Sequence, residues 1–282
     1  MSETLRVAFQ GERGAYSEQA ALELMGTDIQ VVPCNTFDEA FAAVQEGRCD
    51  RAMLPIENSL AGSIHRNYDL LLQHDLYIQA EHNLRIAHCL IAHPGVDMAD
   101  IRRVYSHPVA LAQCEDTLRG LGDSVEIMPT MDTAGSVRLI KEENLQDAAA
   151  IAGERAATIY DMAVLRRDME DEASNYTRFI LLGREAVEPT GEAKTSLAFA
   201  GQNEPGLLFR CLSAFALRDI DLSKIESRPL RGVPWEYVFY VDFAGSLYDA
   251  RCQRAMDHLR EMATFVRVFG SYPRAKVAWV EG

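Results

Sequence analysis

Short apolar runs alternate with amphipathic stretches along the first two thirds of the chain. Each apolar run ends in small or polar residues, and a segment with helical spacing follows it. The predicted strands are Leu5–Phe9, Val31–Cys34, Arg51–Ile56, Arg103–Tyr105, Val125–Met128 and Ala148–Ala152. Helices are expected to begin near Ser17, Thr36, Ser63, Pro108, Thr133 and Glu154. This alternation favours parallel sheets covered by helices.

Local signals support these helix starts and place a candidate site. Thr36 and Glu39 have the spacing of a capping box, Gly47 suits the end of that helix, and Pro108 suits a first helical position. In parallel sheets, ligands bind beyond the carboxyl ends of the strands, where helix N-termini expose backbone N–H groups. Polar residues follow the predicted strands, so we expect an anion-binding site at that edge.

Two long extended segments, Leu76–Ala92 and Thr177–Gly183, interrupt the alternation. Segments of this kind could cross between two lobes, which predicts a bilobed α/β domain with a cleft. Residues Glu185–Ala193 are polar and contain Pro189 and Gly191, so they are predicted to be a linker.

The order of elements changes after the linker. The predicted strands are Thr195–Ala200, Leu222–Leu230, Glu236–Phe243 and Phe265–Tyr272, with helices at Gly206–Leu217 and Tyr248–Met262 and a turn at Arg231–Pro234. This βαββαβ order is the split βαβ, ferredoxin-like arrangement.

Composition narrows the function classes. The 282 residues carry a net charge of −14, which disfavours a nucleic-acid partner, and 48% of them are apolar, enough for two cores. The six cysteines form no CxxC pair, so we expect neither zinc sites nor disulfides. Reduced cysteines are typical of a reducing compartment. The sequence shows neither a signal-peptide pattern at Met1–Arg6 nor a bilayer-spanning apolar run. Together these features predict a cytoplasmic protein without a membrane partner.

Several motifs occur in one order along the chain. They are Gly11–Ser17, Pro55–Ser59, Tyr105–Pro108, Asn175–Phe179 and Glu226–Pro229. With them the chain resembles the prephenate dehydratase family joined to an ACT regulatory domain. The resemblance implies a bilobed, periplasmic-binding-protein-like catalytic domain over residues 1–185 and a ferredoxin-like βαββαβ ACT domain over residues 194–282. It also implies conversion of prephenate to phenylpyruvate, with loss of water and carbon dioxide and with no metal or organic cofactor.

The resemblance further implies roles for individual residues. Thr177 would donate a proton to the leaving hydroxyl, and Arg178 would clamp a carboxylate through its planar guanidinium. The polar groups expected to orient the substrate or hold the site are Asn58, Ser106, Gln113, Glu57, Thr133 and Ser17. Taken alone, Asn58, Ser106 and Thr133 are also common capping or turn residues, and capping is compatible with substrate contact. None of the seven histidines is assigned a catalytic role.

In the second region, the resemblance implies a pocket for the effector L-phenylalanine between paired ACT domains. The expected residues are Asn203, Gly206, Leu207, Leu208, Glu226, Ser227, Arg228 and Pro229. Residues Pro205–Phe209 are a looser match to the family's GALV motif, and the bulky Phe209 leaves the affinity for the effector open. Pairing of such domains implies a homodimer or homotetramer.

Three alternatives remain open at this point. Arogenate dehydratases share these motifs and differ in acting on an amino rather than a keto substrate. Bilobed α/β domains also include sensors that bind a small molecule without catalysis. A nucleotide-dependent enzyme is opposed by the absence of a Gly-Lys-Ser/Thr loop and of a full GxGxxG motif.

Overall fold

The computed structural model describes residues 4–122, 124–230 and 235–276. The predicted turn at Arg231–Pro234 and the first three residues lie outside the described residues. Two compact units divide the chain. Unit 1 contains the residues up to Leu70 and His82–Ile180, and unit 2 contains Leu71–Glu81 and the residues from Leu181 onward.

The first sheet of unit 1 has the strand order β2-β1-β3-β11-β5, with a short β4 paired to β3. Strand β1 lies parallel to both β2 and β3, as the strand–helix alternation predicts. Strand β5 begins in unit 2, and strand β11 ends there. The strands are β1 (Leu5–Gln10), β2 (Ile29–Cys34), β3 (Arg51–Asn58), β4 (Gly62–Ser63), β5 (Tyr77–Arg85) and β11 (Tyr176–Gly183), and the helices are α1 (Tyr16–Met25), α2 (Phe37–Gln45) and α3 (His65–Gln73).

The second sheet has the order β10-β6-β9-β7-β8, with β7 parallel to its two neighbours and β6 antiparallel to its own. Its strands are β6 (Cys89–Ala92), β7 (Arg103–Ser106), β8 (Glu126–Pro129), β9 (Ala148–Ala152) and β10 (Ala163–Arg166). The helices around it are α4 (Pro108–Gln113), α5 (Glu115–Arg119), α6 (Thr133–Glu142) and α7 (Glu154–Ile159), and a 3₁₀ turn, η1, covers Met98–Asp100.

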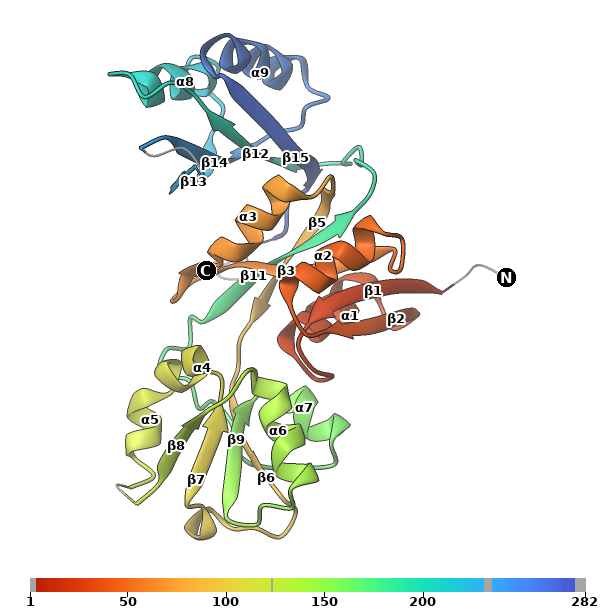
Figure 1. Cartoon of the computed structure of the whole chain (residues 1–282), viewed down its shortest axis with the longest axis vertical. Coiled ribbons are helices and arrows are strands. Elements are labelled where there is room, and N and C mark those ends of the chain that lie inside the picture. Colours follow the sequence, from red (N-terminus) through yellow and green to blue (C-terminus); the bar gives the residue numbers. More distant parts are fainter. Residues whose placement is uncertain (1–3, 123, 231–234, 277–282) are drawn as a thin grey trace. The chain divides into compact units, whose positions relative to one another are not determined.

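Strand β9 shows why its sequence is continuously apolar. Ala148, Ala150 and Ala152 pack into the core formed with α6 and α7. Ala149 and Ile151 pack into the core formed with α4 and α5 on the other face. Because successive strand residues point to opposite faces, a strand that is covered on both sides has no polar positions. Figure 1 shows the two helix pairs on either side of this sheet.

The chain passes from the first sheet to the second between β5 and β6 and returns between β10 and β11. The predicted run Leu76–Ala92 is therefore two strands in two sheets, joined by Ile86–His88. The run predicted at Thr177–Gly183 lies wholly in the first sheet, because the return crossing is the preceding segment, 167–175. Two α/β lobes joined by two crossings confirm the expected bilobed fold.

Unit 2 confirms the predicted βαββαβ order. Its antiparallel sheet has the order β13-β14-β12-β15, and α8 and α9 pack on one face of it (Figure 1). The elements are β12 (Ala193–Ala200), α8 (Leu207–Ala216), β13 (Leu222–Pro229), β14 (Tyr237–Ala244), α9 (Ala250–Met262) and β15 (Phe265–Pro273).

The start of β5 is packed within unit 2 by a buried ion pair. Lys194 Nζ of β12 lies 2.8 Å from Glu81 of β5, and the Glu81 side chain is fully buried. The backbone N–H of Ala275 donates to the same carboxylate at 2.9 Å. A side chain at Gly270 in β15 would collide with the carbonyl of Ile78, so glycine permits the close approach of β15 to β5.

Candidate active site

A cavity of about 610 Å³ lies within unit 1, and both lobes contribute to its lining. Four helix starts reach it: Ala15–Ser17 of α1, Asn35–Asp38 of α2, His107 of α4 and Asp132–Thr133 of α6. Other lining residues come from β1, β3, the β3–β4 turn, α4, β11 and the Ile86–His88 crossing. They include Asn58, Gly62, Ile86, His88, Gln113, Thr177 and Phe179. The site therefore lies where the sequence predicted it, beyond strand ends and at helix N-termini.

Backbone N–H groups, and not cationic side chains, supply the positive potential that this cavity offers to an anion. Among the described residues that line it there is no lysine or arginine, and the carboxylates are Asp38 and Asp132. Thr36 caps α2 by accepting from Glu39 N–H at 3.1 Å, and Asp132 caps α6 by accepting from Gly135 N–H at 2.5 Å. The first N–H groups of a helix have no acceptor inside the helix, and the helix dipole adds a partial positive charge there. These termini suit a carboxylate.

The arrangement around Asn58 determines which way its amide points. Its Oδ1 accepts from the backbone N–H of Leu60 at 3.0 Å and of Ala61 at 2.8 Å. The amide nitrogen must then face β11, where it donates to the Thr177 hydroxyl oxygen at 3.0 Å. Because this hydroxyl accepts from Asn58, its own proton is available to another acceptor. Both side chains are buried at the cavity wall, with exposures of 8% and 7%.

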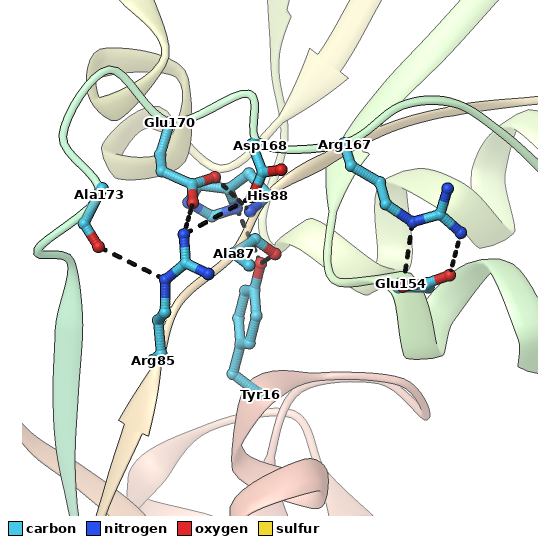
Figure 2. A network of polar contacts seen from close by, with 9 residues as sticks. All are labelled: Tyr16, Arg85, Ala87, His88, Glu154, Arg167, Asp168, Glu170 and Ala173. Carbon is cyan, nitrogen blue, oxygen red and sulfur yellow. Dashed lines mark hydrogen bonds and ion pairs between the residues drawn. The ribbon is translucent and has the colours of Figure 1, made fainter. Parts of the chain in front are cut away.

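Gln113 extends this contact to a buried histidine. Its amide nitrogen donates to Asn58 Oδ1 at 3.3 Å, and its Oε1 lies 3.0 Å from His88 Nε2. The other ring nitrogen of His88 lies 2.8 Å from the hydroxyl of Tyr16, which also lies 2.9 Å from the carbonyl of Ala87. Figure 2 shows Tyr16 reaching from α1 to this crossing segment.

Burial affects the ionisation of the aromatic groups in the site. Desolvation lowers the pKa of His88, although its bond to Gln113 and the charge of Glu170 act in the opposite direction. Burial also lowers the pKa of His107, against the influence of Asp132. Burial raises the pKa of Tyr16 well above its ordinary value. Both histidines are therefore neutral at pH 7, and Tyr16 keeps its proton.

Five of the eight predicted catalytic residues line the cavity: Thr177, Asn58, Gln113, Thr133 and Ser17. Ser106 is fully buried and donates to the carbonyl of Ile151 at 2.6 Å, so it ties β7 to β9 instead. Glu57 precedes Asn58 in β3 and is not among the lining residues.

Arg178, the expected carboxylate clamp, is not among the residues that line the cavity, whereas its neighbours Thr177 and Phe179 are. Successive residues of a strand point to opposite faces, so Thr177 and Arg178 leave β11 on opposite sides. The role of Arg178 as a clamp stays a prediction.

Sequence reasoning missed Tyr16, His88 and His107 as members of the site. Tyr16 and His107 lie inside the motifs Gly11–Ser17 and Tyr105–Pro108, next to the predicted site residues Ser17 and Ser106. His88 had only one signal, its place in a segment expected to cross between lobes, and its contact with Gln113 depends on tertiary structure.

The predicted effector residues form two segments of unit 2. Asn203–Leu208 leads into α8, where Gly206 is the N-cap with φ of 83°, a left-handed conformation that favours glycine. Glu226–Pro229 ends the edge strand β13, and Glu226 lies 3.3 Å from Lys224. Leu207 and Leu208 pack partly against the core of the unit, while Phe209 is 78% exposed.

No helix in the described part of the chain is long and apolar enough to cross a membrane. Within the same residues, no group of three or more histidine, cysteine or acidic side chains is placed to hold a metal ion.

Comparison with known proteins identifies the family. A family model described as prephenate dehydratase matches residues 7–187. A chloroplastic arogenate dehydratase/prephenate dehydratase of Arabidopsis thaliana is 52% identical over 95% of this chain and 73% of that protein. The chain belongs to the prephenate dehydratase family. It is therefore a lyase of the hydro-lyase class.

Solved structures agree with the fold. Prephenate dehydratase from Arthrobacter aurescens, in complex with L-Phe, is 33% identical with a TM-score of 0.88, over 97% of this chain and 93% of that one. A structure described as GqqA, a novel type of quorum quenching acylases, is 34% identical with a TM-score of 0.87, over 96% and 98% of the two chains.

The prediction of a cytoplasmic location is wrong. The Arabidopsis relative above is chloroplastic, and two further Arabidopsis relatives, each 48% identical over 98% of this chain, are chloroplastic as well. Location is read from targeting segments outside the folded domains, so the composition and cysteine content of the folded part do not report it.

Proposed function

We propose that the chain removes water and carbon dioxide from prephenate to give phenylpyruvate, with Thr177 at the leaving hydroxyl. One observation supports this most: the Asn58 amide donates to the Thr177 hydroxyl oxygen at 3.0 Å at the wall of the cavity. The contact leaves the Thr177 proton free to hydrogen-bond the oxygen that departs.

The reaction needs little covalent help from the protein. The bond between the ring and its carboxylate breaks, its electron pair enters the ring, and the ring hydroxyl leaves as water once it has gained a proton. Aromatisation drives the step. A positioned proton donor contributes about 10²–10⁴-fold in rate, and preorganised donors in a buried site contribute through orientation and charge.

Helix N-termini would bind the two carboxylates of the substrate. The starts of α1, α2 and α6 line the same cavity, and each offers N–H groups and the positive end of a helix dipole. Thr133 and Ser17 lie at two of these starts and would add hydroxyl donors. Ser106, Glu57 and Arg178 would act from outside the cavity, by holding β7, β3 and β11.

Arogenate is the second candidate substrate. The relative with 52% identity is named for both dehydratase activities. Arogenate carries an ammonium group where prephenate carries a keto oxygen. Asp38 and Asp132 are the carboxylates of the cavity lining, and either would favour the ammonium group.

We further propose that residues 1–185 form a catalytic domain and residues 194–282 form an ACT domain. The ACT domain would bind L-phenylalanine and thereby inhibit the dehydratase reaction. The Arthrobacter structure, 33% identical over nearly the whole chain, contains L-Phe. Gly206 would let the amino acid approach the start of α8, and Glu226–Pro229 would complete the pocket in a homodimer or homotetramer. Inhibition requires that L-phenylalanine bind one arrangement of the protein better than another.

The test is the initial rate of the purified chain with prephenate and with arogenate, each with and without L-phenylalanine. Formation of phenylpyruvate, suppressed by L-phenylalanine, is the expected result. Faster turnover of arogenate would keep the mechanism and change the substrate. Binding of an aromatic acid without turnover would indicate a sensor, and hydrolysis of acyl amides without dehydration would indicate an acylase.

A further inference from the structure

The buried pair Tyr16–His88 has no role in the chemistry above, yet it is connected to the reacting hydroxyl by three further hydrogen bonds. The contacts run from Tyr16 to His88, Gln113, Asn58 and Thr177, with separations of 2.8, 3.0, 3.3 and 3.0 Å. His88 is 2% exposed. We propose that His88, oriented by Tyr16, is a positioning residue that holds the Gln113 amide in the one orientation compatible with Asn58 and Thr177.

The direction of the hydrogen bonds from Asn58 through Gln113 to His88 follows from a backbone anchor. The N–H groups of Leu60 and Ala61 identify the Asn58 atom beside them as oxygen. The Gln113 atom that faces this oxygen must therefore be the amide nitrogen, and the Gln113 atom that faces His88 must be oxygen. An amide oxygen only accepts, so His88 must carry a proton on Nε2.

Tyr16 contacts the other side of the ring. In neutral His88 with a proton on Nε2, Nδ1 is an acceptor 2.8 Å from the Tyr16 hydroxyl, and the single proton of that hydroxyl is shared between Nδ1 and the carbonyl of Ala87 at 2.9 Å. If the proton moved to Nδ1, the bare Nε2 would face the Gln113 oxygen. Gln113 would then turn its amide, and two oxygens would meet at Asn58.

The backbone of His88 is held independently of its ring. Glu170, whose side chain is 1% exposed, accepts from the His88 N–H at 2.8 Å and pairs with Arg85 at 3.1 Å (Figure 2). Asp168 is a further charged group beside the crossing segment, 3.5 Å from Arg85. The ring is therefore fixed by Glu170 through the backbone, by Tyr16 at Nδ1 and by Gln113 at Nε2. A fixed ring can orient a neighbour without touching the substrate.

Two substitutions at one position test this proposal, which rests on the proposed dehydratase function. In His88→Gln the side-chain amide falls near the place of Nε2 and can still donate to Gln113. In His88→Asn it falls near Nδ1 and cannot. We expect His88→Asn to lower kcat about 10- to 100-fold with little change in KM, and His88→Gln to retain most of the wild-type kcat. His93→Gln is the matched control, because His93 bonds the carbonyl of Ile140 and does not line the cavity.

A spectroscopic measurement makes the test independent of activity. Histidine-labelled protein, with the His88 signal assigned by its loss in His88→Gln, should show the Nε2–H tautomer in ¹⁵N NMR. An Nδ1–H tautomer in the wild type, or equal kcat for His88→Asn and wild type, would overturn the positioning role. An equal loss in both His88 variants with a lowered Tm would also overturn it, by showing a packing role. A wild type without dehydratase activity would instead refute the proposed function, and the tautomer would still test the contact.

Discussion

Asn58 is the residue on which the geometry of the site depends most. Its oxygen is occupied by two backbone N–H groups and by Gln113, and its nitrogen faces Thr177. The backbone N–H groups at its oxygen and the Tyr176 carbonyl, 3.1 Å from its nitrogen, each have a fixed hydrogen-bonding sense, so the side chain has one usable orientation. Because the Asn58 amide donates to the Thr177 hydroxyl oxygen, the Thr177 O–H bond points away from Asn58.

Asn58→Asp tests this directly. The carboxylate keeps the bonds to Leu60 and Ala61 but accepts from Thr177, so the threonine proton turns away from the substrate. The added charge also repels the substrate carboxylates. We expect kcat to fall by about 10²-fold or more, measured as phenylpyruvate formation. A kcat within a few-fold of the wild type would show that the direction of the Thr177 proton is irrelevant.

The sequence predicted which residues line the candidate site better than it predicted how they contact one another. Motifs predict Thr177, Asn58 and Gln113, and these three meet in the structure. Arg178 follows Thr177 in the same motif, and strand alternation places the two side chains on opposite faces of β11. His88 and Gln113 are 25 positions apart and meet only because the crossing segment passes the start of the second lobe. No local pattern contains that contact.

At the scale of elements, helix termini bring the anion-binding groups together. Asp132 is both the cap of α6 and a negative charge in the cavity. Asn caps a helix about as well as Asp. The capping role can therefore be kept while the charge is removed.

Asp132→Asn should lower KM for prephenate by about threefold or more, because a repulsive carboxylate is replaced by a neutral cap. Glu142→Gln is the control, since it removes an equal charge from the exposed far end of the same helix. We expect no change in KM there. A higher KM in Asp132→Asn would mean that Asp132 binds a cationic or hydroxyl group of the substrate.

The β1–α1 loop depends on a glycine that packs against α7. At Gly14, φ is 90°, and an added Cβ would lie 2.7 Å from the Cα of Ala156. Gly26, with φ of 81°, has nothing within 4 Å of such a Cβ. Gly26→Ala should cost about 1–3 kcal/mol of unfolding free energy through backbone strain alone. Gly14→Ala should cost about 1–3 kcal/mol more through overpacking.

Denaturant unfolding of the two variants measures this difference. Equal losses would show that the contact between Gly14 and Ala156 relaxes without cost.

Elements were predicted well where both faces of a strand are buried, as in β9. Strand β10 was missed because it is short, lies at an edge and ends in Arg166.

At the scale of the whole molecule, the chain divides into units that its linear sequence does not separate. The sequence predicted a boundary at a polar linker. In the structure, Leu71–Glu81 belongs with the C-terminal residues through contacts such as Lys194–Glu81. A contact between residues so far apart in the sequence cannot be predicted from the composition of either segment.

Glu81→Gln should lower the stability of unit 2 by about 3–5 kcal/mol, because it removes the carboxylate that lies 2.8 Å from the buried ammonium group of Lys194. Asp257→Asn removes one partner of an exposed pair with Arg260 and should cost less than about 1 kcal/mol. Thermal unfolding of both variants compares the two. Similar small losses would mean that water reaches Lys194 and replaces the carboxylate.

The central claim is that the Thr177 hydroxyl assists departure of the ring hydroxyl of prephenate. The most direct measurement is kcat for phenylpyruvate formation by the wild type, Thr177→Ser and Thr177→Val, with Tm as the check on folding. We predict a loss of about 10²–10⁴-fold in Thr177→Val, a much smaller loss in Thr177→Ser, and little change in KM or Tm. A Thr177→Val protein that turns over prephenate at the wild-type rate would contradict the account.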